Sequence, residues 1–422
     1  MLSAEGPARH ISLMPTPLAT TRLIAAALVT ASALLSAGTA RAQMTIDTAL
    51  DAGVATMVAR LDLERYKATI KGLTKFGDRR QGTKRNRDAV TWIEAQLKSY
   101  GCANVERLTY EYLPPSAAPR PAAPPGGQGP RNPDAAQGGG RLRGLRARTG
   151  VNTDSLRQPD AAIRAVDAEP TTPGKREQVY CTKIGTTHPD EMYIIGAHMD
   201  GHGWNEAAND DGSGTALVME LARVFSSPDV QTDRSIRFAL WNNEETGLNG
   251  ARAYVQQRQA LQGQENPQGS GKYPEPRWLG MIQHDMMLWD HGMPLADGTL
   301  PKEQRPEADV NIEFQANSKQ WLESSMLAWA VAFANERFAT DYPAAVGPHM
   351  TNTDSTPFQD LVPSISLREN ERGREIGAGW DPNWHQPSDV FATYSDKDFR
   401  LGLNAAQTTL GAVGRLVRAT VK

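Results

Sequence analysis

The sequence lacks several features that mark large classes of proteins. Beyond its first 42 residues it has no apolar segment long enough to cross a bilayer, so we expect no membrane span there. It has no excess of positive charge, because 45 Lys and Arg face 48 Asp and Glu and the net charge is -3. That balance gives no reason to expect nucleic acid or an anionic membrane as a partner. It has no internal repeat, and its 422 residues suffice for one large α/β domain, although the length alone would also allow two.

The first 42 residues carry the features of a secretory signal. An arginine precedes the apolar stretch Leu23–Leu35, which is too short for a comfortable membrane span. Ala40-Arg41-Ala42 fits the small-x-small pattern of a cleavage site, so we expect residues 1–42 to be removed and the mature chain to begin at Gln43. A start at Met14 would give the signal a more usual form than a start at the first residue. The protein is expected to be exported, to a periplasmic or extracellular location.

Only two cysteines are present, Cys102 and Cys181. Export would allow them to pair, because disulfides persist in oxidising compartments. Two separate buried thiols are the alternative, and the sequence does not choose between them.

A change of composition divides the expected mature chain, residues 43–422, which we interpret as a single domain with an insertion. The stretch from Pro114 to Gly140 is rich in Pro, Gly and Ala and has almost nothing to bury, so we expect a flexible segment without a fold of its own. The insertion is expected to cover 114–176. It includes an arginine run that we interpret as a solvated loop, and order is expected to return near Glu177.

Outside the insertion the hydrophobic periodicity predicts alternating strands and helices. Helices are expected at 47–75, 86–100, 212–226, 247–258, 318–337 and 395–418. Strands are expected at 105–113, 178–184, 192–198, 235–242, 279–285 and 363–367. Apolar strands that alternate with helices indicate a mostly parallel sheet covered on both faces, a three-layer α/β/α fold.

Polar side chains follow three of these strands at the point where each strand ends. His198 ends one apolar run, Glu244 and Glu245 follow another, and Asp285 ends a third. Ligands bind at the carboxyl ends of strands in such sheets, so we expect these side chains to share one site. Imidazoles and carboxylates on strand ends are what a hydrolytic zinc site requires.

Five motifs in this order resemble the co-catalytic dizinc exopeptidases. They are His-x-Asp at His198, Asn-Asp-x-Gly-Ser-Gly at Asn209, Glu-Glu-x-Gly-Leu-x-Gly at Glu244, the strand-end Asp285, and Trp-His-x-Pro-x-Asp at Trp384. The family includes secreted bacterial leucine aminopeptidases, glutamate carboxypeptidase and, as a divergent branch, glutaminyl cyclases. The resemblance covers about residues 60–113 and 177–420. No single motif is decisive, but five in the family's order are highly specific.

The resemblance implies two zinc ions held by five residues of this chain: His198, Asp210, Glu245, Asp285 and His385. His198 and Asp285 would hold one zinc ion. Glu245 and His385 would hold the other, and Asp210 would bridge the two.

The resemblance also implies the catalytic roles. Glu244 would be the general base that takes a proton from a zinc-activated water and passes it to the leaving amine. Asp200 would support His198 with its carboxylate. Several family members have an oxyanion-stabilising tyrosine near the last histidine, where this chain has Trp384. Tyr342, Tyr394 or the metal alone are then the candidates for that role.

Other histidines and aromatic residues are expected outside the ligand set. His202 is interpreted as lining the loop, and His284 as facing away from Asp285 on the same strand. Trp289, Trp321, Phe358 and Trp380 are interpreted as core or as walls of a substrate pocket, Asp354 as a turn residue or a substrate contact, and His349 as a border of the pocket.

The function expected from the family is peptide hydrolysis by a secreted or periplasmic zinc aminopeptidase. A carboxypeptidase would need a basic partner for the substrate carboxylate, for which Arg368, Arg372 and Arg374 are candidates. An N-terminal glutaminyl cyclase is a further alternative, and so is a non-catalytic binding module on the same fold. The presence of Glu244 and all five ligands argues against the binding module.

Overall fold

The computed structural model describes residues 47–113, 155–156, 158–202, 204–289, 310–348, 353–369, 381 and 383–422. The expected signal segment, 1–42, lies outside the described residues. So does most of the expected insertion.

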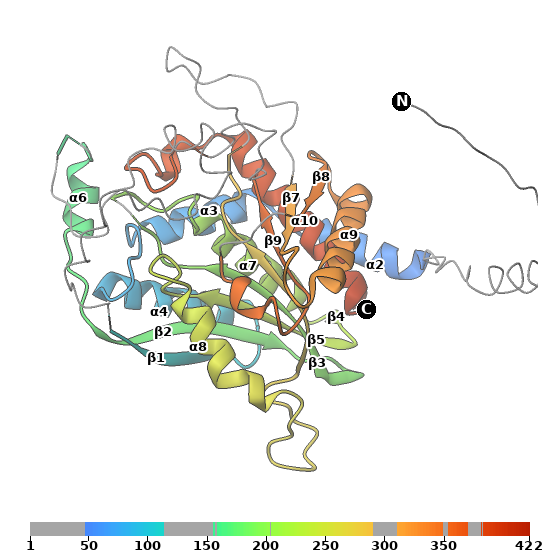
Figure 1. Cartoon of the computed structure of the whole chain (residues 1–422). Coiled ribbons are helices and arrows are strands. Elements are labelled where there is room, and N and C mark those ends of the chain that lie inside the picture. Colours follow the sequence, from blue (N-terminus) through green and yellow to red (C-terminus); the bar gives the residue numbers. More distant parts are fainter. Residues whose placement is uncertain are drawn as a thin grey trace, which may run out of the picture. The chain divides into compact units, whose positions relative to one another are not determined.

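Within the described residues, eight strands form one mixed sheet in the order β1-β2-β5-β3-β6-β9-β7-β8 (Figure 1). They are β1 (Glu106–Tyr112), β2 (Gly174–Lys183), β3 (His188–His198), β5 (Arg234–Trp241), β6 (Arg277–His284), β7 (Val310–Phe314), β8 (Ala344–Gly347) and β9 (Ser364–Arg368). The central strands β5, β3, β6 and β9 are parallel, as are β7 and β8. The pairs β1–β2, β2–β5 and β9–β7 are antiparallel. The parallel strands therefore occupy the centre of the sheet, where the site was expected.

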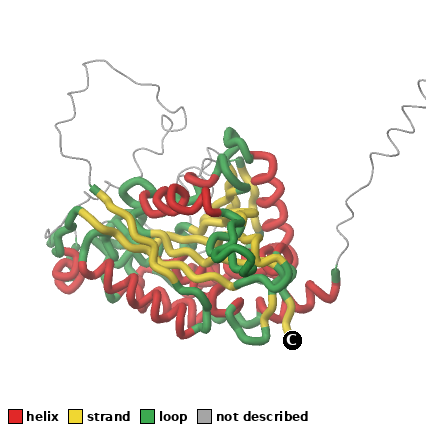
Figure 2. The backbone as a smooth tube through the Cα atoms, turned by 90° about the horizontal axis from the view of Figure 1, so that it is seen from below, coloured by secondary structure: helices red, strands yellow, loops and turns green. Residues whose placement is uncertain are grey.

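Helices cover both faces of this sheet, which confirms the three-layer arrangement (Figure 2). The α-helices of the described residues are α2 (Thr48–Val58), α3 (Leu63–Thr74), α4 (Lys84–Ser99), α6 (Ala161–Asp167), α7 (Gly212–Phe225), α8 (Asn249–Arg258), α9 (Trp321–Phe338) and α10 (Asp396–Leu416), of which α6 lies apart from the sheet faces. A second, two-stranded sheet pairs β4 (Val230–Gln231) with β10 (Thr420–Val421). Among the described residues, no helix combines the length and hydropathy that a membrane crossing requires.

The alternation of side chains along β3 divides the core into two layers. Ile195 faces the larger core, where it joins Leu217 of α7, whereas Ile194 faces a smaller core with Tyr254 of α8. Successive residues of a strand point to opposite faces, so a strand buried on both sides must be apolar throughout. This requirement is why the central strands read as continuous apolar runs in the sequence.

The structure departs from the sequence expectations at the insertion and at one edge of the sheet. Helix α6 and the first residues of β2 lie inside the range 114–176, so the expected insertion is too long at its C-terminal end. Asp160 caps α6 by accepting hydrogen bonds from two backbone N–H groups, a local signal that composition alone does not reveal. The short strands β7 and β8 were also not expected.

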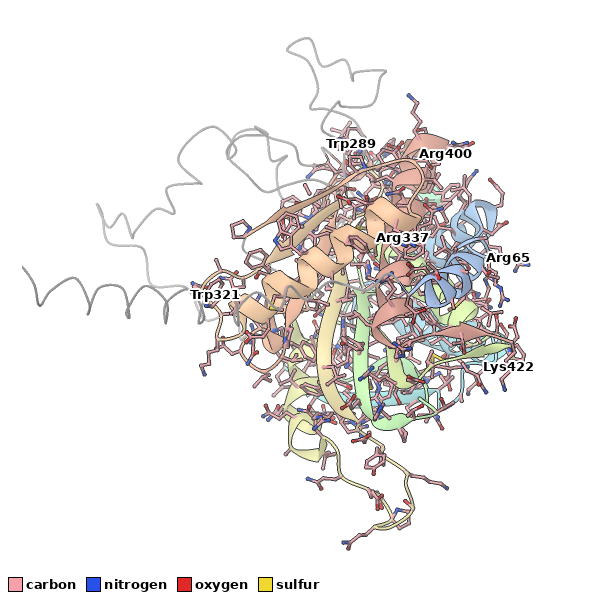
Figure 3. All side chains as sticks on the ribbon, turned by 90° about the vertical axis from the view of Figure 1, so that its right-hand side faces the viewer. Arg65, Trp289, Trp321, Arg337, Arg400 and Lys422 are labelled. Atoms are coloured by element: carbon pink, nitrogen blue, oxygen red, sulfur yellow. A yellow bond between two sulfur atoms is a disulfide. The ribbon has the colours of Figure 1, made fainter. Side chains whose placement is uncertain are left out.

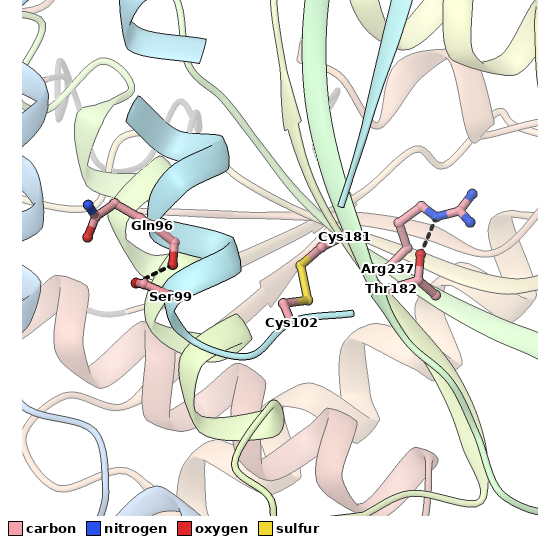
Figure 4. The surroundings of a disulfide bond; sticks show 6 residues. All are labelled: Gln96, Ser99, Cys102, Cys181, Thr182 and Arg237. Carbon is pink, nitrogen blue, oxygen red and sulfur yellow. Dashed lines mark hydrogen bonds between the residues drawn. A yellow bond between two sulfur atoms is a disulfide. The ribbon is translucent and has the colours of Figure 1, made fainter. Parts of the chain in front are cut away.

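The two cysteines form a disulfide, Cys102–Cys181 (Figure 4). It joins the segment after α4 to β2, and the bonded residues are 79 positions apart in the sequence. The larger core surrounds it, since both cysteines are buried there. The alternative of two separate thiols is therefore wrong.

Candidate active site

The candidate ligands gather at the carboxyl ends of three adjacent strands. His198 is the last residue of β3, Glu245 follows β5, and Asp285 directly follows β6. Asp210 lies in the turn before α7, and His385 lies in the loop before α10. These five residues come from five separate segments, and the parallel centre of the sheet brings them together.

Residues at or beside the ligands adopt an uncommon backbone conformation. His385 has a φ of 56°, Met286 next to Asp285 has 63°, and Asn243, close to Glu245, has 65°. Non-glycine residues rarely adopt positive φ, and those that do cluster at functional sites. The backbone therefore takes an uncommon conformation at or beside the three ligands His385, Asp285 and Glu245.

Asp210 stands between the two imidazoles. Its Oδ1 lies 3.2 Å from His198 Nε2, and its Oδ2 lies 2.9 Å from His385 Nε2. Asp285 Oδ1 lies 3.7 Å from His198 Nε2, and Glu245 Oε2 lies 3.0 Å from His385 Nε2. The structure thus assembles the two predicted halves of the site, with one oxygen of Asp210 directed to each half.

The donor atoms fit two zinc ions. Zinc–nitrogen and zinc–oxygen bonds of about 2.0–2.2 Å in a tetrahedral site place ligand atoms roughly 3.4 Å apart. The four separations between donor atoms here run from 2.9 to 3.7 Å. Buried Glu245 Oε1 has no hydrogen-bond partner, which is expected of an oxygen that faces a metal. The site contains two compact groups of candidate metal donors: His198, Asp210 and Glu245 form one, which crosses the two halves, and His198, Asp211 and Asp285 form the other. Asp211 was not predicted as a ligand.

Asp200 supports His198 in a different way from the one expected. The Asp200 backbone carbonyl lies 2.8 Å from His198 Nδ1, whereas the nearest Asp200 carboxylate oxygen lies 3.9 Å away. The carboxylate instead accepts the backbone N–H of Glu244 at 3.0 Å. Asp200 therefore connects the ends of two strands. Its backbone carbonyl orients the His198 imidazole, and its carboxylate holds the backbone of Glu244.

Arg368 binds the Asp285 oxygen that does not face His198. Its guanidinium Nη2 donates to Asp285 Oδ2 at 2.9 Å, and its Nε lies 3.6 Å from Glu313 Oε2. All three side chains are buried. Burial raises the pKa of Asp285, but the Arg368 charge and the contact with His198 together outweigh burial, and the pKa falls to about 2. Asp285 is therefore an ionised carboxylate with its other oxygen directed to His198.

Asn209 connects the loops that carry three of the ligands. Its Nδ2 donates to Glu369 and to Asp381, each at 2.9 Å, and its Oδ1 accepts the backbone N–H groups of Met287 and Leu288. The loops joined in this way carry Asp210, Asp285 and His385. Every side chain of this network is buried, so its hydrogen bonds fix the loops relative to one another.

Asp389 adds a second connection between the same loops. Its carboxylate oxygens accept the backbone N–H groups of Asn209 and Asp210 at 2.8 and 3.1 Å. The Tyr394 hydroxyl donates to Asp389 and also to Asp381. Tyr342 donates its hydroxyl to the backbone of Lys397. Both tyrosine hydroxyls are thus engaged within the protein, which leaves the metal as the remaining candidate for stabilising the oxyanion.

Negative charge dominates the electrostatics of the site. Burial lowers the pKa of His385, but the carboxylates of Glu245 and Asp210 outweigh burial and raise it to about 10. Burial raises the pKa of Glu244 well above its usual range, and the neighbouring Glu245 adds to the rise. A site with this surplus of carboxylates favours cations, whether protons or metal ions.

Asp354 belongs to this acidic surround, which the sequence left open. It is fully buried, neither of its carboxylate oxygens has a hydrogen-bond partner, and burial raises its pKa well above the usual range. Its charge acts on His198 and Glu244, so it lies beside the site. The chain segment around Asp354 reads as an ordinary turn, and no local pattern in the sequence distinguishes it.

The structure also places the other histidines and aromatic residues that the sequence singled out. His284 is buried on the opposite side of β6 and contacts Gly196 O and Thr409 Oγ1, as expected of a residue outside the ligand set. The His202 ring lies 4.4 Å from the His385 ring, so His202 does line the site. Trp289 and Phe358 lie in the two cores, which excludes them as pocket walls, and Trp321 is 49% exposed rather than buried. His349, Arg372, Arg374 and Trp380 lie outside the described residues.

The sequence is similar to a family of peptidases and to individual aminopeptidases. The model of Peptidase family M28 matches residues 179–407. The aminopeptidase YwaD of Bacillus subtilis (strain 168) is 46% identical over 68 residues, which cover 16% of this chain and 14% of YwaD. The probable lipoprotein aminopeptidase LpqL of Mycobacterium tuberculosis is 34% identical over 268 residues, 62% of this chain and 48% of LpqL. The matched segments thus span half or less of these relatives.

Solved structures show the same fold. BSAP, a zinc aminopeptidase from Bacillus subtilis, has a TM-score of 0.54 and 16% sequence identity. The match covers 85% of this chain and 95% of that chain.

Proposed function

We propose an activity for this chain from the premise that it belongs to peptidase family M28, whose model matches more than half of its residues. The activity is the removal of residues from free peptide N-termini by a zinc-dependent aminopeptidase. The observation that carries this proposal is the bridging position of Asp210 between two imidazoles, within a site rich in carboxylates.

The surroundings of the site favour an amine rather than a carboxylate as the recognised end of the peptide. Glu244 and Asp354 add two carboxyl groups beyond the five candidate ligands. The candidate base for a substrate carboxylate, Arg368, is buried and already paired with Asp285 and Glu313. A substrate ammonium gains from unneutralised carboxylates, whereas a terminal carboxylate would be repelled.

Each residue of the site then has a proposed part in hydrolysis. Two zinc ions held by the five candidate ligands would acidify a water and polarise the peptide carbonyl. Glu244 accepts a proton on its carboxylate and later donates it to the leaving amine. Asp200 keeps Glu244 in place through the backbone N–H of that residue.

The ligand assignment is tested by metal content. We expect about two zinc ions per chain in protein purified without added metal. Asp210→Ala should remove more zinc than His202→Ala, because Asp210 faces both imidazoles whereas His202 only lies against one of them. Fully active protein without metal would contradict the assignment.

The substrate assignment is tested with matched anilides. Leucine, lysine and glutamate anilides are compared with acetyl-blocked leucine anilide and with a peptide whose N-terminus is blocked. We expect hydrolysis of the free amines and almost none of the blocked compounds. Comparable kcat/KM for blocked substrates would reject an aminopeptidase, and release of C-terminal residues would establish a carboxypeptidase. A preference for uncharged side chains would rest on Trp289, Phe358 and Trp380. The first two are core residues and Trp380 lies outside the described residues, so we propose no side-chain preference.

We further propose that the protein is exported. The disulfide Cys102–Cys181 supports this proposal, because such bonds persist in oxidising compartments. Mass analysis of the protein from its own host should find a mature N-terminus at Gln43. An unprocessed chain in the cytoplasm would contradict it.

A further inference from the structure

Helix α9 has an apolar face that nothing in the described part of the chain covers. Its inner face packs into the larger core through Leu327, Val331 and Phe338. On the opposite face Leu322, Met326 and Trp329 are 50%, 65% and 63% exposed. Figure 3 looks onto this helix, with Trp321 at one end and Arg337 toward the other. Soluble helices usually present polar side chains to water, so a helix apolar on both faces indicates a second contact surface.

The size of this face matches the centre of a protein interface. Trp321, Leu322, Met326 and Trp329 are each about half exposed or more. At roughly 200 Å² for a large apolar residue, they leave about 450 Å² of apolar surface. A stable pairwise interface buries about 800 Å² on each partner, with an apolar core and a polar rim. The exposed face would therefore supply about half of the area that a dimer needs.

The outward residues of α9 and the turn before it follow a heptad pattern. Steps of three and four residues, as in a coiled-coil seam, connect Lys319, Leu322, Met326, Trp329, Phe333 and Glu336. Phe333 is half-buried, with the Arg415 guanidinium over its ring, and the other members of this set are exposed. A regular seam on the solvent side indicates that the partner is itself a helix.

The seam is complementary to itself when two copies run antiparallel. A two-fold axis between Met326 and Trp329 places each Met326 against the partner copy's Trp329 position and each Leu322 against the position of Phe333. The same register places Lys319, in the turn before α9, against Glu336 near the end of the helix. Lys319 is exposed and its Nζ lies 3.9 Å from Asp360 Oδ2 of its own chain, so its ammonium would turn from Asp360 to the partner copy's Glu336. A C₂ interface requires a self-complementary pattern of this kind, and the seam meets that requirement.

We propose that α9 is a homodimerisation surface, at which two copies of this chain pair their α9 helices antiparallel along the seam from Lys319 to Glu336. Burial of the apolar residues supplies the driving force for association. The two symmetric Lys319–Glu336 pairs select the antiparallel register, because a parallel pairing would bring like charges together.

The test is the concentration dependence of the molar mass, measured by sedimentation velocity on the whole protein from the low micromolar to the hundred micromolar range. Wild-type protein should reach twice the monomer mass. Met326→Glu and Trp329→Glu should remain monomeric throughout, because each places a charge at the centre of the seam. Leu261→Glu is the matched control: Leu261 is 42% exposed but lies after α8, and its variant should dimerise like the wild type.

A charge exchange tests the register. Lys319→Glu should weaken dimerisation about 2- to 30-fold, as expected for two exposed ion pairs. The double change Lys319→Glu with Glu336→Lys should restore it. Circular dichroism and the Tm check that each variant is folded. We expect all of them to fold, because the changed side chains are exposed.

Three results would overturn the proposal. The first is a wild type that stays monomeric at every concentration. The second is a dimer that Met326→Glu and Trp329→Glu leave intact. The third is a monomer that binds phosphatidylglycerol vesicles through Trp329, which would make a lipid surface the occupant instead of a second copy.

Discussion

Replacing Asn209 by Asp tests whether the buried network behind the ligands holds their loops in place. The change keeps the shape of the side chain and the Oδ1 that accepts from Met287 and Leu288. It replaces the Nδ2 donor by a second oxygen, which then faces carboxylate oxygens of Glu369 and Asp381 at the former donor distances of 2.9 Å. Two hydrogen bonds thus become two repulsive contacts.

The size of the effect follows from those two bonds. A hydrogen bond to a charged group contributes about 1.5–3 kcal/mol, so losing both costs roughly 3–6 kcal/mol when the carboxyl groups are ionised. A folded domain has a total stability of about 5–15 kcal/mol, so we expect a large fall in the Tm at pH 8, on the order of 5–15 °C.

The loss should shrink as the pH falls. Burial raises the pKa of Asp381 to about 6 and that of Glu369 well above its usual range, so protons are available within the network. The carboxyl at position 209 would also have a raised pKa in the folded protein. A raised folded-state pKa means that stability is retained below the unfolded value of about 3.9 and lost as the pH rises through the folded value. At pH 5 a shared proton restores one hydrogen bond, and Asn209→Asp should approach the wild type.

The assay is thermal melting from pH 5 to pH 8, with and without added zinc, accompanied by calorimetric zinc binding. Asn249→Asp is the matched control, because the Asn249 amide donates only at 3.5 Å and outside the network. An Asn209→Asp protein with a wild-type Tm at pH 8, or with an equal loss at both pH values, would refute the reasoning.

Three further outcomes are expected. Glu244→Gln should keep its zinc content and Tm but lower kcat about 10²–10⁴-fold, as measured with leucine anilide beside metal analysis; near-normal kcat with zinc retained would reject Glu244 as the base. Asp167→Asn should flatten the pH dependence of stability. Burial raises the pKa of Asp167 to about 8, so this carboxyl group should make wild-type stability fall as the pH rises from about 4 toward 8, and melts of the variant should show a shallower slope. Reducing the Cys102–Cys181 disulfide should cost about 2–4 kcal/mol in denaturant titrations, because the bond restrains a long loop in the unfolded chain; an unchanged midpoint would contradict this.

The sequence was informative where one physical rule applied along a continuous segment. Apolar runs predicted the central strands, because strands buried on both faces must be apolar throughout. The ends of those runs then located His198, Glu245 and Asp285, and the structure brings all three together. The family's motif order added Asp210 and His385, whose loops have no periodicity from which their positions could be worked out.

Residues that act through long-range hydrogen bonds were not predictable in this way. Asn209 bonds to partners 160 and 172 positions away in the sequence. Arg368 was a candidate for binding a substrate carboxylate, because the sequence did not show that Asp285 and Glu313 occupy it. The role of Asp200 differs for a similar reason: the family resemblance implied that its carboxylate supports His198, but the segment after β3 presents the backbone carbonyl to the imidazole instead.

The contrast between local patterns and long-range hydrogen bonds also explains why so many buried polar side chains surround the candidate ligands. A metal site built on five separate segments has no local structure to fix its donor atoms, so each ligand needs support from elsewhere in the chain. Arg368 holds Asp285, Asp389 holds the backbone of Asp210, and the Asp200 carbonyl orients His198. Because buried hydrogen-bonded groups are costly to separate, these contacts keep the donor atoms close together although their mutual repulsion would drive them apart. The surplus negative charge is then available to bind cations, and the network behind it supplies the rigidity that the strand ends alone cannot.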